Sequence, residues 1–291
     1  MTRWLAVTIF VPAGFGEAVS NFLIEQGATG IEEVGGDSKE ERVRTYLEED
    51  GRERRVLRNL RRYLKSLEKI EPELSHSRVE TTSLADQDWG EKWKTFFKPV
   101  QVTSRLIVKP PWSRIRLRKD QIAIEINPAM AFGTGTHATT KLCLKVLERS
   151  LRRKGLSVLD VGTGSGILSI AAAKLGAREV WGIDIDRLAV ENARENAERN
   201  GVSDIVKISK GSIGRVEKRF DVVIANIDQK NLRRMRWPLI RHLEDQGFLV
   251  LSGILEGEAV PLRQSYLETN HVRFARVTQE EGWACLTFQK K

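Results

Sequence analysis

Three glycines at alternate positions, between a predicted strand and a predicted helix, constrain this chain more than any other feature. The run Leu156-Ser-Val-Leu-Asp-Val-Gly-Thr-Gly-Ser-Gly166 leads into a helix pattern, and the strand after that helix ends at Asp184. Glycine has no Cβ, so the backbone of such a loop can approach a ligand closely. The helix start presents N–H groups without internal partners, and Asp184 can accept both hydroxyls of a ribose. The pattern is half of a nucleotide-binding fold.

The glycine spacing selects among nucleotide ligands. A dinucleotide fingerprint, Gly-x-Gly-x-x-Gly, would place a glycine where this chain has Ile167. This disfavours a pyrophosphate cofactor and a dehydrogenase. It favours an adenosyl group that carries an amino acid, which is S-adenosylmethionine. The alternative is a helix-capping turn without a ligand, and the strand before the loop and the carboxylate after it argue against that alternative.

Strand and helix patterns alternate from residue 156 onward, which predicts a parallel sheet with helices on both faces. The tail 272–289 adds two antiparallel strands around a turn. We therefore expect an α/β, seven-stranded, doubly wound Rossmann-like methyltransferase domain over residues 101–291. The expected strands are 156–161, 179–184, 205–209, 220–226 and 247–253, and the expected helices lie near 167–175, 187–200, 230–243 and 257–268.

Residues 1–82 predict a separate small domain of the ferredoxin-like α+β kind, with the order βαββαβ. It contains no cluster of catalytic side chains, so we expect it to recognise a substrate. Residues 83–100 carry aromatic side chains at helical spacing and predict a helical linker whose apolar stripe packs on a domain. The predicted strands of the first domain are 3–11, 28–34, 42–47 and 76–82, and its predicted helices are 17–26 and 53–67.

Charge is unevenly distributed along the chain. The net charge is +9, but residues 1–82 hold 13 Lys and Arg against 15 Asp and Glu, so the remainder carries +11. A basic second half suits an acidic or nucleic-acid-rich partner or aids solubility, and both interpretations stay open. The basic run Ser113–Lys119 is typical of a solvated strand edge. Cys143 and Cys285 lie in apolar patterns without paired spacing, which indicates reduced thiols in a cytoplasmic protein. No signal peptide or membrane-length apolar run is evident.

Ligands of open α/β sheets bind at the carboxyl ends of the strands. That rule places Asp160, Gly162, Gly164, Asp184, Gly211-Ser212 and Asn226-Ile-Asp228 at one site. Asp160 is expected to bond either loop amides or the amino group of the methionine. Asn226 is the catalytic candidate, because its amide can orient the acceptor amine or the cofactor.

A second stretch, Asn127 to Thr140, is rich in glycine and threonine and stands directly before an amphipathic helix. It predicts a cofactor lid in which threonine caps the helix and leaves hydroxyl and N–H groups free for a carboxylate. His137 is expected to be a hydrogen-bonded loop residue rather than a general base. The other histidines are scattered, and we expect no metal site.

Several motifs together resemble those of the bacterial ribosomal protein lysine methyltransferases, which methylate protein eleven of the large ribosomal subunit. The resemblance covers roughly residues 86–255 at motif level, and no single motif is specific by itself. The motifs are Asp86-Gln-Asp-Trp-Gly-Glu-Lys-Trp-Lys94, Phe132-Gly-Thr-Gly-Thr-His-Ala-Thr-Thr140, Asp160-Val-Gly-Thr-Gly-Ser-Gly166, Gly182-Ile-Asp-Ile-Asp186, Val223-Ile-Ala-Asn-Ile227 and Leu251-Ser-Gly-Ile-Leu255.

The resemblance implies cofactor contacts from Thr140, Gly162, Asp184 and Asn226, with Phe132 close by. It also implies that the N-terminal domain grips the substrate while the linker lets it swing. The chain departs from the family pattern at Asn127, Thr163 and Asp228, where Asp, Cys and an apolar residue are usual. For Asp228, capture of a lysine ammonium and capping of the next helix remain equal alternatives.

The resulting expectation is methyl transfer from S-adenosylmethionine to lysine amines, with an N-terminal amine as a further acceptor, on a large-subunit ribosomal protein. Proximity to ribosomal RNA through the basic surface is expected as well. An RNA base methyltransferase and a methyltransferase for another protein are the alternatives, although residues 226–229 lack the Asn-Pro-Pro-aromatic tetrapeptide of many base methylators. A module that merely senses the cofactor is disfavoured by the intact glycine loop and Asp184.

Overall fold

The computed structural model describes residues 4–26, 28–34, 40–49, 51, 53–68, 71–84, 97–127, 137–151 and 155–291. The chain divides into two compact units, Met1–Phe97 (unit 1) and Lys98–Lys291 (unit 2). The division falls inside the segment 83–100 that was predicted as a linker. Residues 85–96, on which the prediction of a linker helix depends, lie outside the described residues.

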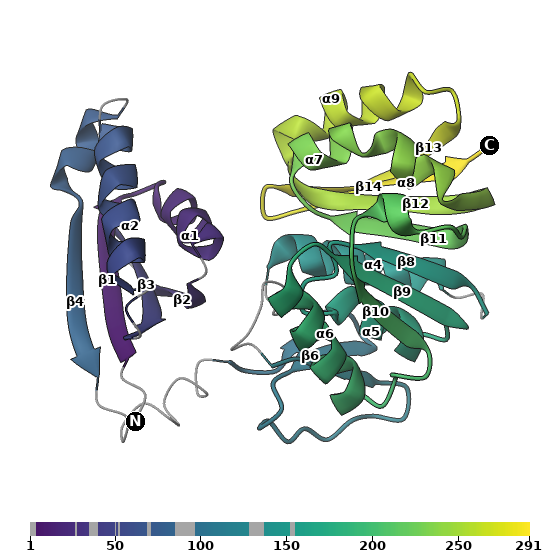
Figure 1. Ribbon diagram of the computed structural model, residues 1–291, viewed down its shortest axis with the longest axis horizontal. Helices are drawn as coiled ribbons and strands as arrows, with labels where there is room; N and C mark the ends of the chain where they lie inside the picture. The colour runs from purple at the N-terminus through teal and green to yellow at the C-terminus, as the bar shows by residue number, and fades with distance from the viewer. Residues whose placement is uncertain are drawn as a thin grey trace. The chain divides into compact units, whose positions relative to one another are not determined.

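Unit 1 contains one antiparallel sheet with the strand order β2-β3-β1-β4. This order, with the first and third strands in the centre, is that of a ferredoxin-like fold and confirms the prediction (Figure 1). The elements are β1 (Trp4–Pro12), α1 (Gly16–Glu25), β2 (Thr29–Val34), β3 (Glu40–Glu48), α2 (Glu53–Glu68), the 3-10 turn η1 (Pro72–His76) and β4 (Arg78–Leu84).

Both helices of unit 1 pack into a single core with the central strand. Val7, Ile9 and Val11 alternate along β1, so they point to the same face of the sheet. Val19 and Leu23 of α1 join the same core. The apolar side chains of α2 recur at every fourth position, which places them on one stripe of the helix and leaves the opposite stripe in water.

Unit 2 contains a seven-stranded sheet with the order β10-β9-β8-β11-β12-β14-β13. All neighbouring pairs are parallel except those of β14, which runs antiparallel between β12 and β13. The order reverses between β8 and β11, which makes the gap between them the switch point of a doubly wound sheet. The predicted fold is confirmed. The strands are β8 (Ser157–Val161), β9 (Glu179–Asp184), β10 (Val206–Lys210), β11 (Phe220–Asn226), β12 (Leu243–Leu255), β13 (Val272–Glu280) and β14 (Trp283–Lys290).

Two apolar cores lie on the two faces of this sheet. Val222 and Ile224 of β11 belong to one core, and Val223 and Ala225 belong to the other, because successive side chains of a strand point to opposite faces. The helices divide in the same way. The first core takes α4 (Ala138–Ser150), α5 (Ile167–Lys174) and α6 (Arg187–Arg199), and the second takes α7 (Gln229–Arg234), α8 (Arg236–Arg241) and α9 (Glu256–Leu267).

The structure corrects two predictions. The single helix expected over 230–243 is two short helices, α7 and α8. The break falls at Met235, and Pro238 in the first turn of α8 has no N–H to donate to the carbonyl of Arg234, which favours a break at this point. The strand expected from 247 already begins at Leu243.

The basic run Ser113–Lys119 is also not a strand edge. It lies in the connection between β6 (Leu106–Lys109) and β7 (Ile122–Glu125). These two strands and β5 (Val100–Gln101) form a small separate sheet in the order β5-β6-β7. Two prolines directly after β6 remove the N–H groups that a continued strand would need.

No helix among the described residues is long and apolar enough to span a membrane.

Candidate cofactor and active site

The carboxyl ends of β8, β9 and β11 meet beside the switch point and bring the predicted site residues together. The Gly162 N–H donates to the carbonyl of Ile183 at 2.9 Å, and the Gly164 N–H donates to Asp184 Oδ2 at 3.0 Å. On the other side, a Cβ added at Gly162 would stand 2.7 Å from Cγ2 of Ile227, the residue that follows β11. The loop therefore touches both neighbouring strand ends.

The glycine loop needs glycine for its backbone conformation. Gly162, Gly164 and Gly166 have φ values of 75°, 54° and 80°, which lie in the left-handed region that other residues rarely adopt. Gly166 also caps α5, and a Cβ there would be 3.1 Å from Cβ of Ala193 in α6. The loop is therefore both a turn and a close approach of backbone segments.

Asp184 is half-buried, and its carboxylate is fixed by the backbone on both sides. Oδ2 accepts from the Gly164 N–H, and Oδ1 accepts from the Asp186 N–H, both at 3.0 Å. An ionised carboxylate has about four acceptor positions, so about two remain. That number matches the two hydroxyls of a ribose. The predicted Gly211 lies next to this point, since its N–H donates to the Asp184 carbonyl at 2.8 Å.

Two apolar side chains beside Asp184 were missed by the sequence reasoning. Ile185 is 76% exposed and Leu188 is 61% exposed, although both are large hydrophobic residues. Ile185 directly follows Asp184, and Leu188 lies in the first turn of α6, so exposed apolar surface adjoins the end of β9. The signal was an isoleucine directly after the strand-end acid, where a surface turn would favour a polar residue.

Asp160 is fully buried at the end of β8. Its Oδ2 accepts from the hydroxyls of Thr163 and Ser169, each at 2.7 Å. Burial raises the pKa of this carboxyl, the hydrogen bonds from Thr163 and Ser169 oppose that shift, and the negative charge of Asp184 adds to it, so the pKa lies at about 6.

The hydrogen bonds of Asp160 bear on two open questions. Its side-chain partners are hydroxyls rather than the loop amides of one alternative, and the departure at Thr163 supplies one of them. Within the described part of the chain its Oδ1 is buried and has no partner. A cationic amino group would satisfy this oxygen.

Asn226 ends β11 with an unsatisfied amide oxygen. Its Oδ1 is buried and finds no hydrogen-bond partner among the described residues, although the next residue, Ile227, donates its N–H to the Ser252 carbonyl at 3.1 Å. A buried amide oxygen without a partner costs free energy, so a ligand hydrogen bond at this position would be favourable.

Asp228 caps α7. It accepts from the N–H of Asn231 at 2.9 Å and from its Nδ2 at 2.6 Å, and the helix begins at Gln229. This geometry supports the capping alternative. Capture of a lysine ammonium by the same carboxylate stays a prediction.

The start of α4 corrects one prediction. His137, rather than a threonine, caps the helix: its Nδ1 accepts from the Thr139 N–H at 3.3 Å. Its ring packs against Trp283 with centroids 4.8 Å apart. Burial lowers the pKa of His137, so the imidazole is held neutral as a hydrogen-bonded loop residue.

Thr140 lies in the first turn of α4, buried, and its hydroxyl has no partner among the described residues. The predicted contact Phe132, like all of 128–136, lies outside the described residues. Across the described part of the chain, no group of three or more His, Cys, Asp or Glu side chains is placed to hold a metal ion.

The 3-2-1-4-5-7-6 order of the sheet, the glycine loop at the switch point and the carboxylate at the end of the second strand define the class of S-adenosylmethionine-dependent methyltransferases. Residues 3–291 match the model of one family in this class, described as ribosomal protein L11 methyltransferase (PrmA). The chain belongs to that family.

Relatives and a solved structure agree with this assignment. The ribosomal protein L11 methyltransferase of Citrifermentans bemidjiense is 35% identical over 305 residues, with 99% of each chain covered. The protein of the same name from Pelotomaculum thermopropionicum is 36% identical over 312 residues, again with 99% of each covered. The crystal structure of a ribosomal protein L11 methylase from Lactobacillus delbrueckii subsp. bulgaricus superposes with a TM-score of 0.63 at 35% identity and covers 67% of this chain and 100% of that one.

Proposed function

We propose that this enzyme transfers methyl groups from S-adenosylmethionine to lysine amines of ribosomal protein L11, with the N-terminal amine as a further acceptor. The observation that carries the proposal is the family match over residues 3–291, which spans unit 1 as well as the methyltransferase unit. A match confined to unit 2 would support only the transfer of a methyl group to some acceptor.

The site residues fit the cofactor in four places. Asp184 keeps acceptor positions for the ribose hydroxyls, and the glycine loop offers backbone without side chains. The buried Oδ1 of Asp160 would bind the amino group, and the Thr140 hydroxyl would bind the carboxylate of the methionine part. Asp160 Oδ1 and the Thr140 hydroxyl otherwise have no partner among the described residues.

When it is bound, S-adenosylmethionine supplies a methyl group that its sulfonium has already activated. The protein must therefore align the acceptor nitrogen in line with that methyl and exclude water. Asn226 is proposed to accept a hydrogen bond from the acceptor amine through its buried Oδ1 and so to direct the lone pair. A lysine ammonium must first lose a proton, and desolvation in an apolar pocket favours the neutral amine.

The two units are proposed to divide the work. Unit 1 would hold the ribosomal protein, because its core contains only packing residues, and unit 2 would hold the cofactor and Asn226. A ribosomal protein is made and assembled in the cytoplasm, so we place the enzyme there. The excess of +11 over residues 83–291 is proposed to keep the enzyme close to ribosomal RNA.

Mass spectrometry of ribosomal proteins tests the proposal. A strain that lacks this gene should yield protein L11 without its methyl groups, and the intact gene should restore them. A gene carrying Asn226→Ala should restore them poorly although the protein accumulates normally. Unchanged methylation of L11 in the deletion strain, with loss on another protein or on RNA bases, would refute the assignment.

A further inference from the structure

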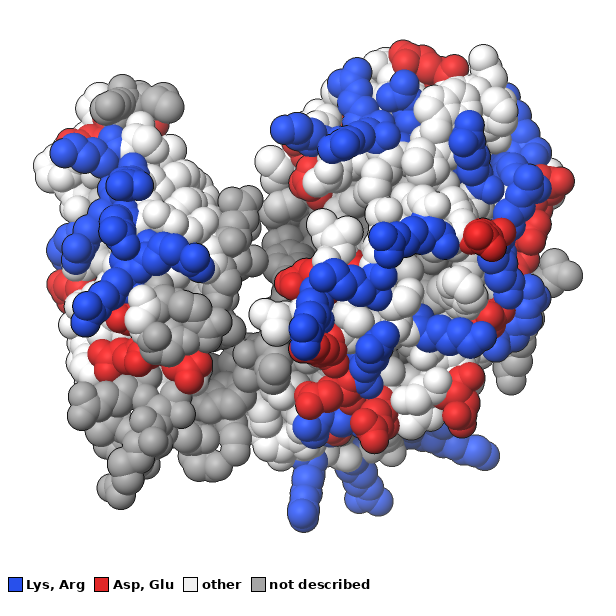
Figure 2. All heavy atoms as spheres, in the orientation of Figure 1, with Lys and Arg blue, Asp and Glu red and all other residues white. Residues whose placement is uncertain are grey.

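Helix α2 of unit 1 presents a row of exposed basic side chains on the stripe that faces away from the sheet. Val56, Leu60 and Leu64 bury the other stripe. The space-filling view shows blue atoms running along α2 on this face of unit 1 (Figure 2). The basic residues are Arg54, Arg55, Arg58, Arg61, Arg62 and Lys65.

This positive charge is local. α2 has six basic residues against Glu53 and Glu68, a net charge of +4, whereas the rest of residues 1–82 carries −6. Residues 1–82 therefore carry a net negative charge overall, yet nearly half of their Lys and Arg residues lie on this one helix.

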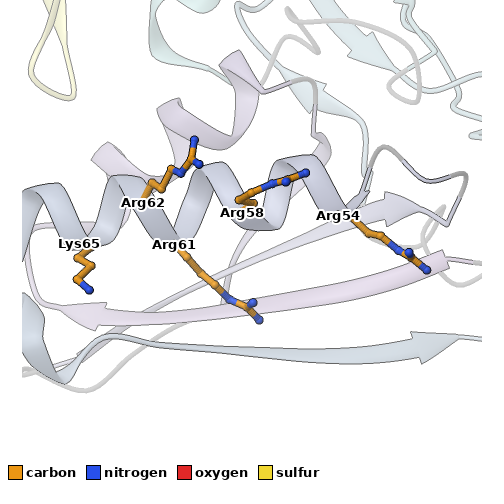
Figure 3. A pocket seen from close by; sticks show the side chains of 5 residues that line it. All are labelled: Arg54, Arg58, Arg61, Arg62 and Lys65. Carbon is orange, nitrogen blue, oxygen red and sulfur yellow. The ribbon is translucent and has the colours of Figure 1, made fainter.

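Five of these side chains line one shallow hollow of about 520 Å³: Arg54, Arg58, Arg61, Arg62 and Lys65. They follow one another along about three turns of α2, and some lean to each side of its axis (Figure 3). Arg54 has an ion pair, with Glu53 at 3.5 Å, but its side chain remains 87% exposed. In the part of the chain that the structure describes, the other four have no hydrogen-bond or ion-pair partner.

The row is unfavourable for the helix itself. Neighbours three or four positions apart on a helix lie side by side, and like charges there repel. Arg58 has such neighbours at Arg54, Arg61 and Arg62, and Lys65 has them at Arg61 and Arg62. A polyanion laid along α2 would remove this repulsion, because each cation would gain an anionic partner.

We propose that this α2 face binds the phosphate backbone of RNA. Four of the five lining residues are arginines, whose planar forks bind phosphate oxygens in pairs. A nucleic-acid strand presents an unbroken series of charges that suits a row of cations, whereas a protein would need carboxylates at matching intervals. The choice of RNA over DNA rests on the proposed function, since a ribosomal protein is presented beside RNA.

Fluorescence anisotropy of a labelled single-stranded RNA oligonucleotide with the full-length protein, over a series of salt concentrations, tests the proposal. The substitution Arg58→Gln/Arg61→Gln/Arg62→Gln removes three phosphate contacts. The slope of log affinity against log salt should then fall by about 2, and the affinity near 0.1 M salt should fall about 100-fold. An unchanged slope would overturn the proposal.

Matched variants distinguish RNA binding at the hollow from a general effect of the net charge of the protein. Arg114→Gln/Arg116→Gln/Lys119→Gln removes three exposed cations from unit 2. Because unit 2 is proposed to attract RNA only through its general positive charge, this variant should lower the salt slope much less than the triple α2 variant does. If the triple α2 variant fails to fold, the single changes Arg58→Gln, Arg61→Gln and Arg62→Gln should each lower the slope by about 0.7. Arg55→Gln, on the same helix but outside the hollow, is their control. Equal losses in test and control variants would overturn the proposal.

Two further measurements test whether the α2 face binds RNA, an acidic protein or the substrate L11. A poly-glutamate peptide should compete poorly with the RNA for the enzyme, and equal competition would show that the face binds an acidic protein instead. The triple α2 variant should methylate isolated L11 with the wild-type KM, because the face is proposed to act only when RNA is present. A raised KM of the variant without RNA would show that the α2 face binds L11 instead of RNA. If the wild-type enzyme did not methylate L11 at all, the proposed function would be refuted, but the RNA-binding measurement would still stand.

Discussion

At the residue scale, two carboxylates beside one glycine loop have opposite environments. Asp160 is fully buried and bonded to two hydroxyls, whereas Asp184 is half-buried and bonded to two backbone N–H groups. Burial makes the charge of Asp160 costly although two hydroxyls donate to it, and amide partners with access to water leave Asp184 ready to accept a ligand. One consequence of each environment can be measured.

Asp184→Ala should weaken binding of S-adenosylmethionine by about 1–3 kcal/mol, because two ribose hydroxyls lose a charged acceptor. Calorimetric titration of the folded variant measures this loss. Asp204→Ala, which removes an exposed carboxylate from the turn before β10, is the control and should bind normally. Wild-type affinity in the Asp184 variant would remove this residue from the site.

Asp160 should make the stability of unit 2 depend on pH. The pKa of its carboxyl is about 6 in the folded chain against 3.8 without burial, so the folded state holds a proton that the unfolded state has lost between these values. Stability therefore falls as pH rises through this window. From pH 4.5 to 7.5 the unfolding free energy should fall by about 2 kcal/mol on this account.

Urea unfolding of the wild type and of Asp160→Asn at both pH values isolates this effect. Asparagine keeps an acceptor for Thr163 and Ser169 but has no proton to lose. The variant should thus gain about 2 kcal/mol relative to the wild type on going from pH 4.5 to 7.5. A difference that does not change with pH would show that the buried carboxyl titrates normally.

At the element scale, the residue that follows β11 packs closely against the end of β12. Gly253 of β12 has φ of 85°, and a Cβ there would stand 2.5 Å from the carbonyl oxygen of Ile227. Cγ2 of Ile227 also lies close to Gly162 on the other side. Ile227 is therefore held between two glycines, and its position fixes that of Asn226.

Gly253→Ala should destabilise the protein by about 2 kcal/mol or more, because the strain of a left-handed residue adds to a clash with backbone atoms, which cannot move aside as a side chain can. Gly201→Ala is a matched control: φ there is 65°, but a Cβ would meet nothing within 4 Å. In the control, the unfolding free energy should fall only by the strain of a non-glycine residue in the left-handed conformation, about 1–2 kcal/mol. Thermal or urea unfolding of the two variants compares them, and equal losses would show that the contact with Ile227 relaxes freely.

Elements whose local signals agree were predicted from the sequence, and an element with conflicting local signals was not. β8, the glycine loop and β9 follow from a buried apolar run, three glycines and a strand-end acid. The helix expected over 230–243 was wrong because Pro238 outweighs the apolar periodicity around it.

The site divides in a similar way. Gly162, Asp184 and Asn226 were placed together by a rule about the ends of parallel strands. The hydroxyl partners of Asp160 depend on side-chain positions that strand patterns do not fix, and the exposure of Ile185 was overlooked for the same reason.

At the scale of the whole molecule, the two compact units allow the division of labour to be measured. A fragment that begins at Lys98 retains the whole of unit 2, so it should bind S-adenosylmethionine with nearly the affinity of the full chain. It should lose most of its activity on intact L11, because unit 1 is proposed to hold that protein. Calorimetry and a methylation assay with L11 measure the two properties, and full activity in the fragment would refute the recognition role.

The position of β14 in the unit 2 sheet has a consequence for synthesis. β14 is translated after every other strand of that sheet, yet it lies between β12 and β13 and pairs with both. Until residues 283–290 leave the ribosome, β12 has an open edge and β13 has no neighbour. The sheet that carries the cofactor site can close only after this last strand has been released, so the nascent chain remains dependent on protection of that edge throughout its elongation.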